Sequence, residues 1–298
     1  MEIQDETVES ILEQDFSHLQ VELIIVLSGN SSPRNEIFKI FSEKNLPIRV
    51  FDDLGKGLGA ARQIIVEKAR GEFIVWIDSD VKMPSDFLRN QFEFMRKNSD
   101  VGVAIGVYDA KEFKGRLIAT VFGLLMAILR VVYFGATITR TDALREVGGF
   151  DRRIQGASED VDLVTRLVIR NWKVAFNNEA KFSRELRETL QDIFRRGIWY
   201  GRGGHFLNCK YKSRSNIPRR LPPFHFLWGV KLSVKTYRKI YNRKAFFLPV
   251  ITLVQSIGWS VGYCKAHFAG YGHSISNHEI DMFQTKKARE RMNKMLSY

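Results

Sequence analysis

Short apolar runs alternate with amphipathic segments through the first 180 residues of the chain. Five runs have the length and apolar character of buried strands: 21–27, 48–51, 73–77, 101–107 and 134–139. A last strand is expected at residues 172–182, with its apolar start at Lys173-Val-Ala-Phe-Asn. Helical spacing of apolar positions marks the segments between and after them: 5–16, 35–44, 59–69, 86–97, 117–132, 141–150, 159–168 and 184–200. This alternation predicts an α/β fold with a mostly parallel central sheet flanked by helices.

Two carboxylates follow the apolar run 73–77 directly, at Asp78 and Asp80. In an open α/β sheet, ligands bind outside the carboxyl ends of the strands. Mg²⁺ and Mn²⁺ are commonly held by one or two carboxylates together with phosphate oxygens of a substrate. Asp and Ser also favour turns, so a solvated turn is the alternative interpretation.

A second acidic group stands where residues 159–168 are expected to begin a helix. Ser158 is a candidate N-cap, which puts Glu159, Asp160 and Asp162 in the first turn. The helix dipole favours acids there, so they could serve stability alone. Three acids within four residues exceed what a cap requires, and we therefore treat them as candidates for chemistry.

The formal net charge of +13 is unevenly distributed. Residues 193–278 contain 15 Lys and Arg and no Asp or Glu, whereas residues 1–192 contain 26 basic and 30 acidic residues. A basic block of this kind, rich in aromatic residues, indicates an anionic partner such as lipid headgroups, nucleic acid or a phosphorylated acceptor.

The cysteines and histidines give no sign of a metal site. Cys209 and Cys264 lie far apart, and the six histidines form no ligand pattern in the sequence, so neither a disulfide framework nor a zinc site is expected. A reducing compartment is then the default. The acidic start of the chain lacks the basic and apolar regions of a signal peptide.

The C-terminal third predicts membrane association. Residues 229–244 mix apolar and basic positions, as an interfacial helix does, and residues 245–264 carry no charge. Twenty residues suffice for a single span, but Pro, Gln and Gly interrupt the run. We expect three parts: residues 1–212, a membrane-associating region 213–275, and a short helical tail 276–298. The expected location is the cytoplasmic face of a membrane, peripheral or monotopic.

Taken in order, five segments resemble the family 2 glycosyltransferases, over roughly residues 7–205. They are Ile24-Ile-Val-Leu-Ser-Gly-Asn-Ser-Ser32, Gly55-Lys-Gly-Leu-Gly-Ala-Ala-Arg62, Trp76-Ile-Asp-Ser-Asp80, Val147-Gly-Gly-Phe-Asp151 with Ser158-Glu-Asp160, and Phe194-Arg-Arg-Gly-Ile-Trp-Tyr-Gly-Arg202. The resemblance implies a GT-A, Rossmann-like fold in residues 1–212. It also implies inverting, metal-dependent transfer of a sugar from a nucleotide-diphosphate donor to a lipid-linked or glycan acceptor, without nucleic acid.

The same resemblance implies roles for individual residues. Asp80 and Asp78 would hold Mn²⁺ or Mg²⁺, and Asp160 would be the catalytic base. The nucleotide sugar would be bound by Ser28, Lys56, Arg62 and Asp78. The acceptor or the diphosphate would be contacted by a last group: Glu159, Arg195, Arg196, Trp199 and Arg202.

The sequence departs from the family pattern at two places. The family usually offers Asp to the nucleotide base after its second strand, where this chain has Ser28 and Asn30. The family's first strand also has no counterpart before Glu2. We therefore expect Met1 to be a misassigned start or the end of a truncation, and we expect the absent strand to leave unpaired sheet edges.

Three other interpretations remain open at this stage. A non-enzymatic adaptor could use the basic, aromatic block to bind a membrane or to stack on single-stranded nucleic acid, and its uncharged run suits lipid better. The chain could also be a catalytically dead relative, as the absent strand suggests. A pyrophosphorylase would share the sheet, but its Gly-rich signature near a first strand is not found.

Overall fold

The computed structural model describes residues 5–16, 19–29, 40–41, 46–109, 117–129, 132–184, 189–212 and 217–275. The chain divides into two compact units. The first comprises residues 1–109, 132–155 and 159–185, and the second comprises 110–131, 156–158 and 186–298. The second unit thus takes in residues 186–212, which the sequence-based division assigned to the first part. The expected tail, 276–298, lies outside the described residues, as does most of the expected helix 35–44.

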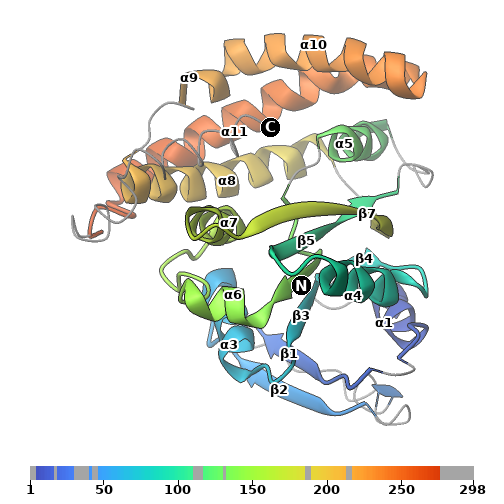
Figure 1. Cartoon of the computed structure of the whole chain (residues 1–298). Coiled ribbons are helices and arrows are strands. Elements are labelled where there is room, and N and C mark those ends of the chain that lie inside the picture. The colour runs from blue at the N-terminus through green and yellow to red at the C-terminus, as the bar shows by residue number, and fades with distance from the viewer. Residues whose placement is uncertain are drawn as a thin grey trace. The chain divides into compact units, whose positions relative to one another are not determined.

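The first unit holds two sheets (Figure 1). β1 (Leu23–Leu27) and β2 (Ile48–Asp52) pair in parallel. The larger sheet has the order β3-β6-β5-β7-β4, in which the strands are β3 (Phe73–Ile77), β6 (Ala136–Arg140), β5 (Val101–Tyr108), β7 (Lys173–Arg184) and β4 (Val81–Lys82). The α/β class is therefore confirmed. The pairing within the larger sheet is mixed, since β5 and β7 are parallel while β3–β6, β5–β6 and β4–β7 are antiparallel.

The antiparallel direction of β6 matters for the site. Its first residue, Ala136, pairs with Ile77, the last residue of β3. The backbone N–H of Asp78 donates to the carbonyl of Gly135 at 3.0 Å. The segment that leads into β6 is thereby held beside the carboxyl end of β3.

Five helices of the first unit are described: α1 (Asp5–Leu12), α3 (Leu58–Lys68), α4 (Phe87–Lys97), α6 (Thr141–Glu146) and α7 (Glu159–Ile169). α4 packs against β5 and β7, as Figure 1 shows. Val8 of α1 and Phe87 of α4 join Met83 and Phe182 in one apolar cluster. The cluster also includes Val81, the first residue of β4, and it thereby anchors the turn between β3 and β4.

The second unit is helical in the part of the chain that the structure describes. It contains α5 (Leu117–Ile128), α8 (Leu190–Tyr211), α9 (Ile217–Arg220), α10 (Pro222–Ile240), the 3₁₀ helix η2 (Arg243–Phe247) and α11 (Leu248–Phe268). The expected helix 184–200 was misplaced at its start, because β7 continues to Arg184. A capping box formed by Thr189 and Asp192 instead starts α8 at Leu190.

Glycines bring α8 and α11 into backbone contact. A Cβ added at Gly201 would lie 2.1 Å from the Trp259 carbonyl oxygen, and one at Gly262 would lie 2.0 Å from that of Ile198. Residues 243–268 have the length and apolar composition to cross a membrane, with 44% of the most apolar window buried. One face of α11 is thus covered by α8.

Candidate active site

The carboxyl end of β3 holds the two aspartates in a tight turn. The Val81 N–H donates to the Asp78 carbonyl at 3.2 Å, and β4 begins at Val81. Val81 in turn pairs with Arg184, the last residue of β7. The strand register therefore brings a cation that is 104 residues away in sequence next to Asp80.

Asp80 forms an ion pair with Arg184. The Asp80 side chain is only 11% exposed and that of Arg184 is 16% exposed, so the pair is shielded from water. Burial disfavours the Arg184 charge, but Tyr133, Asp80 and Asp78 outweigh it and raise the pKa of Arg184. The other oxygen of Asp80, Oδ1, is buried and has no hydrogen-bond partner among the described residues.

Arg62 links the two acidic groups that the sequence singled out. This buried arginine on α3 donates from Nη1 to Glu159 at 2.5 Å and from Nη2 to Asp78 at 3.3 Å. Its guanidinium also lies over the rings of Phe134 and Phe150, 5.5 and 5.8 Å from their centroids. Burial opposes the Arg62 charge, yet Glu159, Asp78 and Asp160 together raise its pKa above the ordinary value. The guanidinium therefore stays charged and holds the acids in one cluster.

Glu159 and Asp160 begin α7 and differ in their surroundings. Glu159 is 2% exposed, and burial followed by the charge of Asp160 raises its pKa. Asp160 is only partly buried and accepts the Val161 N–H at 2.7 Å. Burial likewise raises the pKa of Asp160, against the opposing effect of Arg62. The expected N-cap, Ser158, has φ of 81°, in the left-handed region that non-glycine residues rarely adopt.

A buried acid that the sequence did not single out orders the neighbouring loops. Asp53 follows β2 and is 2% exposed. Its carboxylate accepts the backbone N–H groups of Gly29 at 3.2 Å and Gly55 at 2.8 Å, and the Ser28 hydroxyl donates to it at 3.4 Å. Asp53 thus ties the loop after β1 to the Gly-rich turn, while the Lys56 side chain in that turn is exposed.

Glycines let the Gly-rich turn approach the loop before α7. A Cβ at Gly57 would lie 2.8 Å from the Gln155 carbonyl oxygen. One at Gly59 would lie 2.6 Å from that of Asp151 and 2.7 Å from that of Ile154. This close approach fixes the start of α3, and with it the position of Arg62.

Comparison with known proteins finds a family model that matches the part of the chain containing the first half of this cluster. Residues 5–144, which include Arg62, Asp78 and Asp80, match the family model described as glycosyl transferase family 2. Residues 5–144, a little under half of the chain, are thus similar to glycosyl transferase family 2.

Curated members of the family match parts of the chain. The putative teichuronic acid biosynthesis glycosyltransferase TuaG of Bacillus subtilis is 32% identical over 96 residues, which are 32% of this chain and 37% of TuaG. An uncharacterized glycosyltransferase of Haemophilus influenzae is 34% identical over 83 residues, 28% of this chain and 33% of that protein. The poly-β-1,6-N-acetyl-D-glucosamine synthase of Staphylococcus epidermidis is 22% identical over 217 residues, 68% of this chain and 51% of the synthase. The chain thus spans about half or less of the length of these relatives.

A solved structure shares the fold. The mannosyltransferase PcManGT of Pyrobaculum calidifontis, in complex with GDP-mannose and Mn²⁺, superposes with a TM-score of 0.54 and 17% identity. The similarity covers 97% of this chain and 79% of PcManGT. At this identity the likeness establishes the glycosyltransferase GT-A fold and nothing finer.

The structure brings together some of the residues that the family resemblance singled out. Arg62, Asp78, Asp80, Glu159 and Asp160 form one cluster in the first unit, and Ser28 and Lys56 lie in its loops. The other candidates belong to α8 of the second unit: Arg195, Arg196, Trp199 and Arg202. The guanidinium of Arg196 lies 5.0 Å from the centroid of the Phe122 ring and that of Arg202 lies 5.6 Å from that of Tyr271.

Sequence patterns missed Arg184 and Asp53. Arg184 lies two residues beyond the strand that was expected at 172–182, and its register opposite Val81 was not predicted. Asp53 had a local signal, since an acid before Leu54-Gly55 can accept backbone N–H groups in a turn.

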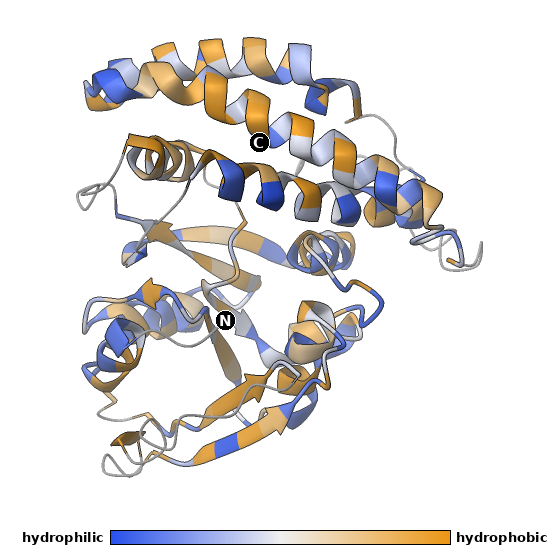
Figure 2. Ribbon diagram, turned by 180° about the vertical axis from the view of Figure 1, so that it is seen from behind, coloured by the Kyte–Doolittle hydropathy of each residue, from blue (hydrophilic) through white to orange (hydrophobic). Residues whose placement is uncertain are grey.

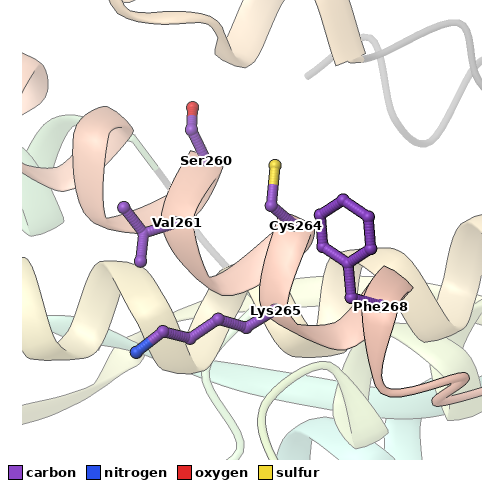
Figure 3. A pocket seen from close by; sticks show the side chains of 5 residues that line it. All are labelled: Ser260, Val261, Cys264, Lys265 and Phe268. Carbon is purple, nitrogen blue, oxygen red and sulfur yellow. The ribbon is translucent and has the colours of Figure 1, made fainter.

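A shallow apolar hollow on α11 differs in chemistry from the carboxylate cluster. Its walls are Ser260, Val261, Cys264, Lys265 and Phe268 (Figure 3). Figure 3 shows Ser260 and Cys264 pointing to the same side of the helix. This lining provides no carboxylate for a metal and no acid to serve as a base.

Proposed function

We propose that this chain is a family 2 glycosyltransferase that transfers a sugar from a nucleotide-diphosphate donor to an acceptor hydroxyl, with inversion at the anomeric carbon. The observation that supports the proposal is the cluster in which Arg62 connects Asp78 with Glu159, beside Asp80 and next to Asp160 in sequence. The transfer requires a site for the diphosphate charge and a base for the acceptor, and this cluster offers carboxylates for both.

Asp80 and Asp78 are suited to holding Mn²⁺ or Mg²⁺. Asp80 Oδ1 is a buried carboxylate oxygen without a hydrogen-bond partner among the described residues, and a buried carboxylate oxygen left in that state is costly. The Asp78 side chain is 34% exposed, so a ligand can reach it. When bound, such an ion supplies Lewis-acid neutralisation of the diphosphate leaving group.

Asp160 is the proposed general base. Burial raises the pKa of Asp160, which makes its carboxylate a stronger base than that of an ordinary aspartate. Glu159 is engaged by Arg62 at 2.5 Å and is nearly inaccessible, so we assign it the positioning of Arg62 and of the start of α7. A single base acting on the face opposite the leaving group gives inversion.

The loop residues are proposed to orient the nucleotide. Lys56 is exposed in the Gly-rich turn and can approach an anionic donor. The Ser28 hydroxyl is held by Asp53 beside Gly29, where it can meet the base or the ribose. Arg62 is proposed to position Asp78 and not to contact the nucleotide itself, because its Nη1 and Nη2 atoms are already paired with Glu159 and Asp78.

The test is calorimetric titration of the full chain with UDP and with GDP, with and without Mn²⁺. We expect one of the two nucleotides to bind in a metal-dependent manner, and we expect D80N to abolish that dependence. D142N is the matched control, because Asp142 is an exposed acid in the first turn of α6. Absence of binding to both nucleotides would contradict the proposal and favour a catalytically dead relative.

We further propose that the chain works on a membrane surface, with a lipid-linked or glycan acceptor. The buried residues of α10 include the small or hydroxyl-bearing Gly229, Ser233 and Thr236. By contrast, the large apolar side chains of Phe224 and Leu227 are 57% and 63% exposed. Figure 2 shows the corresponding apolar stretches of α10 and α11 in orange. Large apolar groups on the solvent side suit a lipid interface. The exposed Arg195, Trp199 and Arg202 remain the proposed contacts to the acceptor or the diphosphate.

A further inference from the structure

Three histidines that are far apart in sequence meet in the second unit. His205 lies on α8, His267 in the last turn of α11 and His273 in the turns that follow. Their ring centroids form a nearly equilateral triangle with sides of 5.4, 5.4 and 5.3 Å. One ring nitrogen from each lies within 4.8 Å of the others. The sequence alone predicts no zinc site, because the six histidines form no ligand pattern along the chain.

The hydrogen bonding of His205 sets its tautomer. Its Nδ1 lies 2.8 Å from the Tyr271 carbonyl oxygen, which can only accept, so Nδ1 carries the proton and donates. The His205 side chain is buried, with 2% of its surface exposed. The lone pair of Nε2 therefore points toward His267, whose Nδ1 is 3.2 Å away. Metal-binding histidines typically donate their other N–H to a carbonyl or carboxylate in this way.

The backbone after α11 is shaped to bring His273 back to the cluster. Gly270 and Gly272 both have positive φ, at 67° and 90°, which only glycine adopts without strain. Gly272 also packs closely on α8, where an added Cβ would lie 3.2 Å from the Phe206 Cα. Cys209, one helical turn beyond His205, has its sulfur 3.8 and 3.9 Å from the two His205 nitrogens.

We propose that His205, His267 and His273 bind a zinc ion that fastens the end of α11 to α8. Imidazole nitrogens suit Zn²⁺, and three protein ligands leave a fourth position for water or the nearby thiolate of Cys209. Tetrahedral nitrogen ligands at Zn–N distances of about 2.0–2.1 Å lie roughly 3.4 Å apart. The His205–His267 pair already has this spacing. The exposed rings of His267 and His273 can rotate to close the remaining distances.

The arrangement without metal would be a hydrogen bond from His267 Nδ1–H to His205 Nε2. The two arrangements can be distinguished by experiment. The hydrogen bond between His205 and His267 requires neither an ion nor the His273 side chain, whereas the zinc site requires both. Zinc binding here is also independent of the proposed glycosyl transfer, since the histidines share no residue with the carboxylate cluster of the first unit.

The experiment is zinc titration of the metal-stripped full chain carrying no histidine tag, with Mg²⁺ in excess to occupy carboxylates. Calorimetry gives the stoichiometry, and visible absorption of substituted Co²⁺ reports tetrahedral nitrogen coordination. H267A and H273A are the test variants, since both side chains are exposed and their loss should not prevent folding. H225A, a histidine on α10 that stacks on Trp228, is the matched control.

We expect one zinc ion per chain and a loss of at least ~100-fold in affinity in each test variant, because even outer-shell partners are worth ~10–100-fold. H225A and D80N should bind zinc as the unaltered chain does. A smaller loss in both test variants, or no zinc binding by the unaltered chain, overturns the proposal and leaves the histidines as a hydrogen-bonded contact.

Discussion

At the scale of single residues, Asp160 is the carboxylate whose protonation should limit transfer on the acid side. The base acts in its deprotonated form, and burial raises the pKa of Asp160 above the ordinary aspartate value. kcat/KM should therefore fall as the pH decreases through that raised pKa, at a pH above the ~3.9 of an unperturbed aspartate. The test is to measure initial rates of transfer at a series of acidic pH values. The donor is a sugar linked to whichever nucleotide, UDP or GDP, binds in the calorimetric titration.

Replacing Asp160 with asparagine should abolish the decrease of kcat/KM at acidic pH and should also remove most of the transfer activity. We expect D160N to lower transfer by at least ~10²-fold, the low end of a general acid–base contribution. Binding of the nucleotide should persist, because the change leaves the aspartates after β3 in place. Transfer by D160N at close to the rate of the D142N control would remove Asp160 from the role of base.

Arg184 gives a second prediction at this scale. It neutralises Asp80 in the described structure, and a divalent ion would compete with it for that carboxylate. R184Q should therefore strengthen binding of Mn²⁺ alone while weakening binding of the nucleotide diphosphate, which loses a nearby cation. Calorimetry of Mn²⁺ with and without nucleotide separates the two effects, and weaker binding of Mn²⁺ alone would contradict the competition.

Local sequence patterns anticipated the acids but not their partners. Asp78 and Asp80 end an apolar run, and Glu159 and Asp160 begin an amphipathic one, so each pair has a local signal. The partner of Asp80 is 104 residues away, and the link from Arg62 to Glu159 spans 97 residues. Such contacts depend on strand order and register, which hydrophobic periodicity does not encode.

At the scale of elements, the start of α3 should tolerate no side chain at Gly59. Replacing a helical glycine with alanine in open space would stabilise by up to about 1 kcal/mol. Here the new Cβ would lie 2.6 and 2.7 Å from two backbone carbonyl oxygens. We therefore expect G59A to destabilise the chain by about 1–3 kcal/mol, as overpacking does.

Denaturant unfolding of G59A and the unaltered chain measures this change, and a midpoint that moves upward would contradict it. A useful second readout is nucleotide binding, because α3 also carries Arg62. If the strain displaces α3, nucleotide binding should weaken along with stability.

The order of elements followed from the sequence, but several boundaries and directions did not. Continuous apolar runs marked β3 and β5 correctly within a residue. The strand expected at 172–182 corresponds to β7, but its end at Arg184 was not predicted, because Asn177, Asn178 and Glu179 break the apolar pattern in its middle. The antiparallel direction of β6 likewise leaves no trace in composition, although it determines which segment lies beside Asp78.

At the scale of the whole molecule, charge and apolar exposure occur together in the C-terminal part. Residues 193–278 contain 15 basic and no acidic residues, and α10 presents Lys231 and Lys235 beside exposed Phe224 and Leu227. Each basic residue near an anionic leaflet contributes about 1 kcal/mol, and inserted apolar side chains add to that. Two physically distinct terms should therefore act in membrane binding, one sensitive to salt and one insensitive.

Vesicle flotation separates these two terms. The chain should float with vesicles containing anionic lipid at low salt, and the bound fraction should fall with salt because the Debye length shortens from about 10 Å at 0.1 M to 3 Å at 1 M. L227E should reduce the fraction that stays bound at high salt, since it removes an inserted apolar group and adds repulsion. L54E is the matched control, because Leu54 is 71% exposed but belongs to the first unit. Complete recovery of the unaltered chain in the soluble fraction at low salt, or equal losses in L227E and L54E, would contradict a membrane surface on α10.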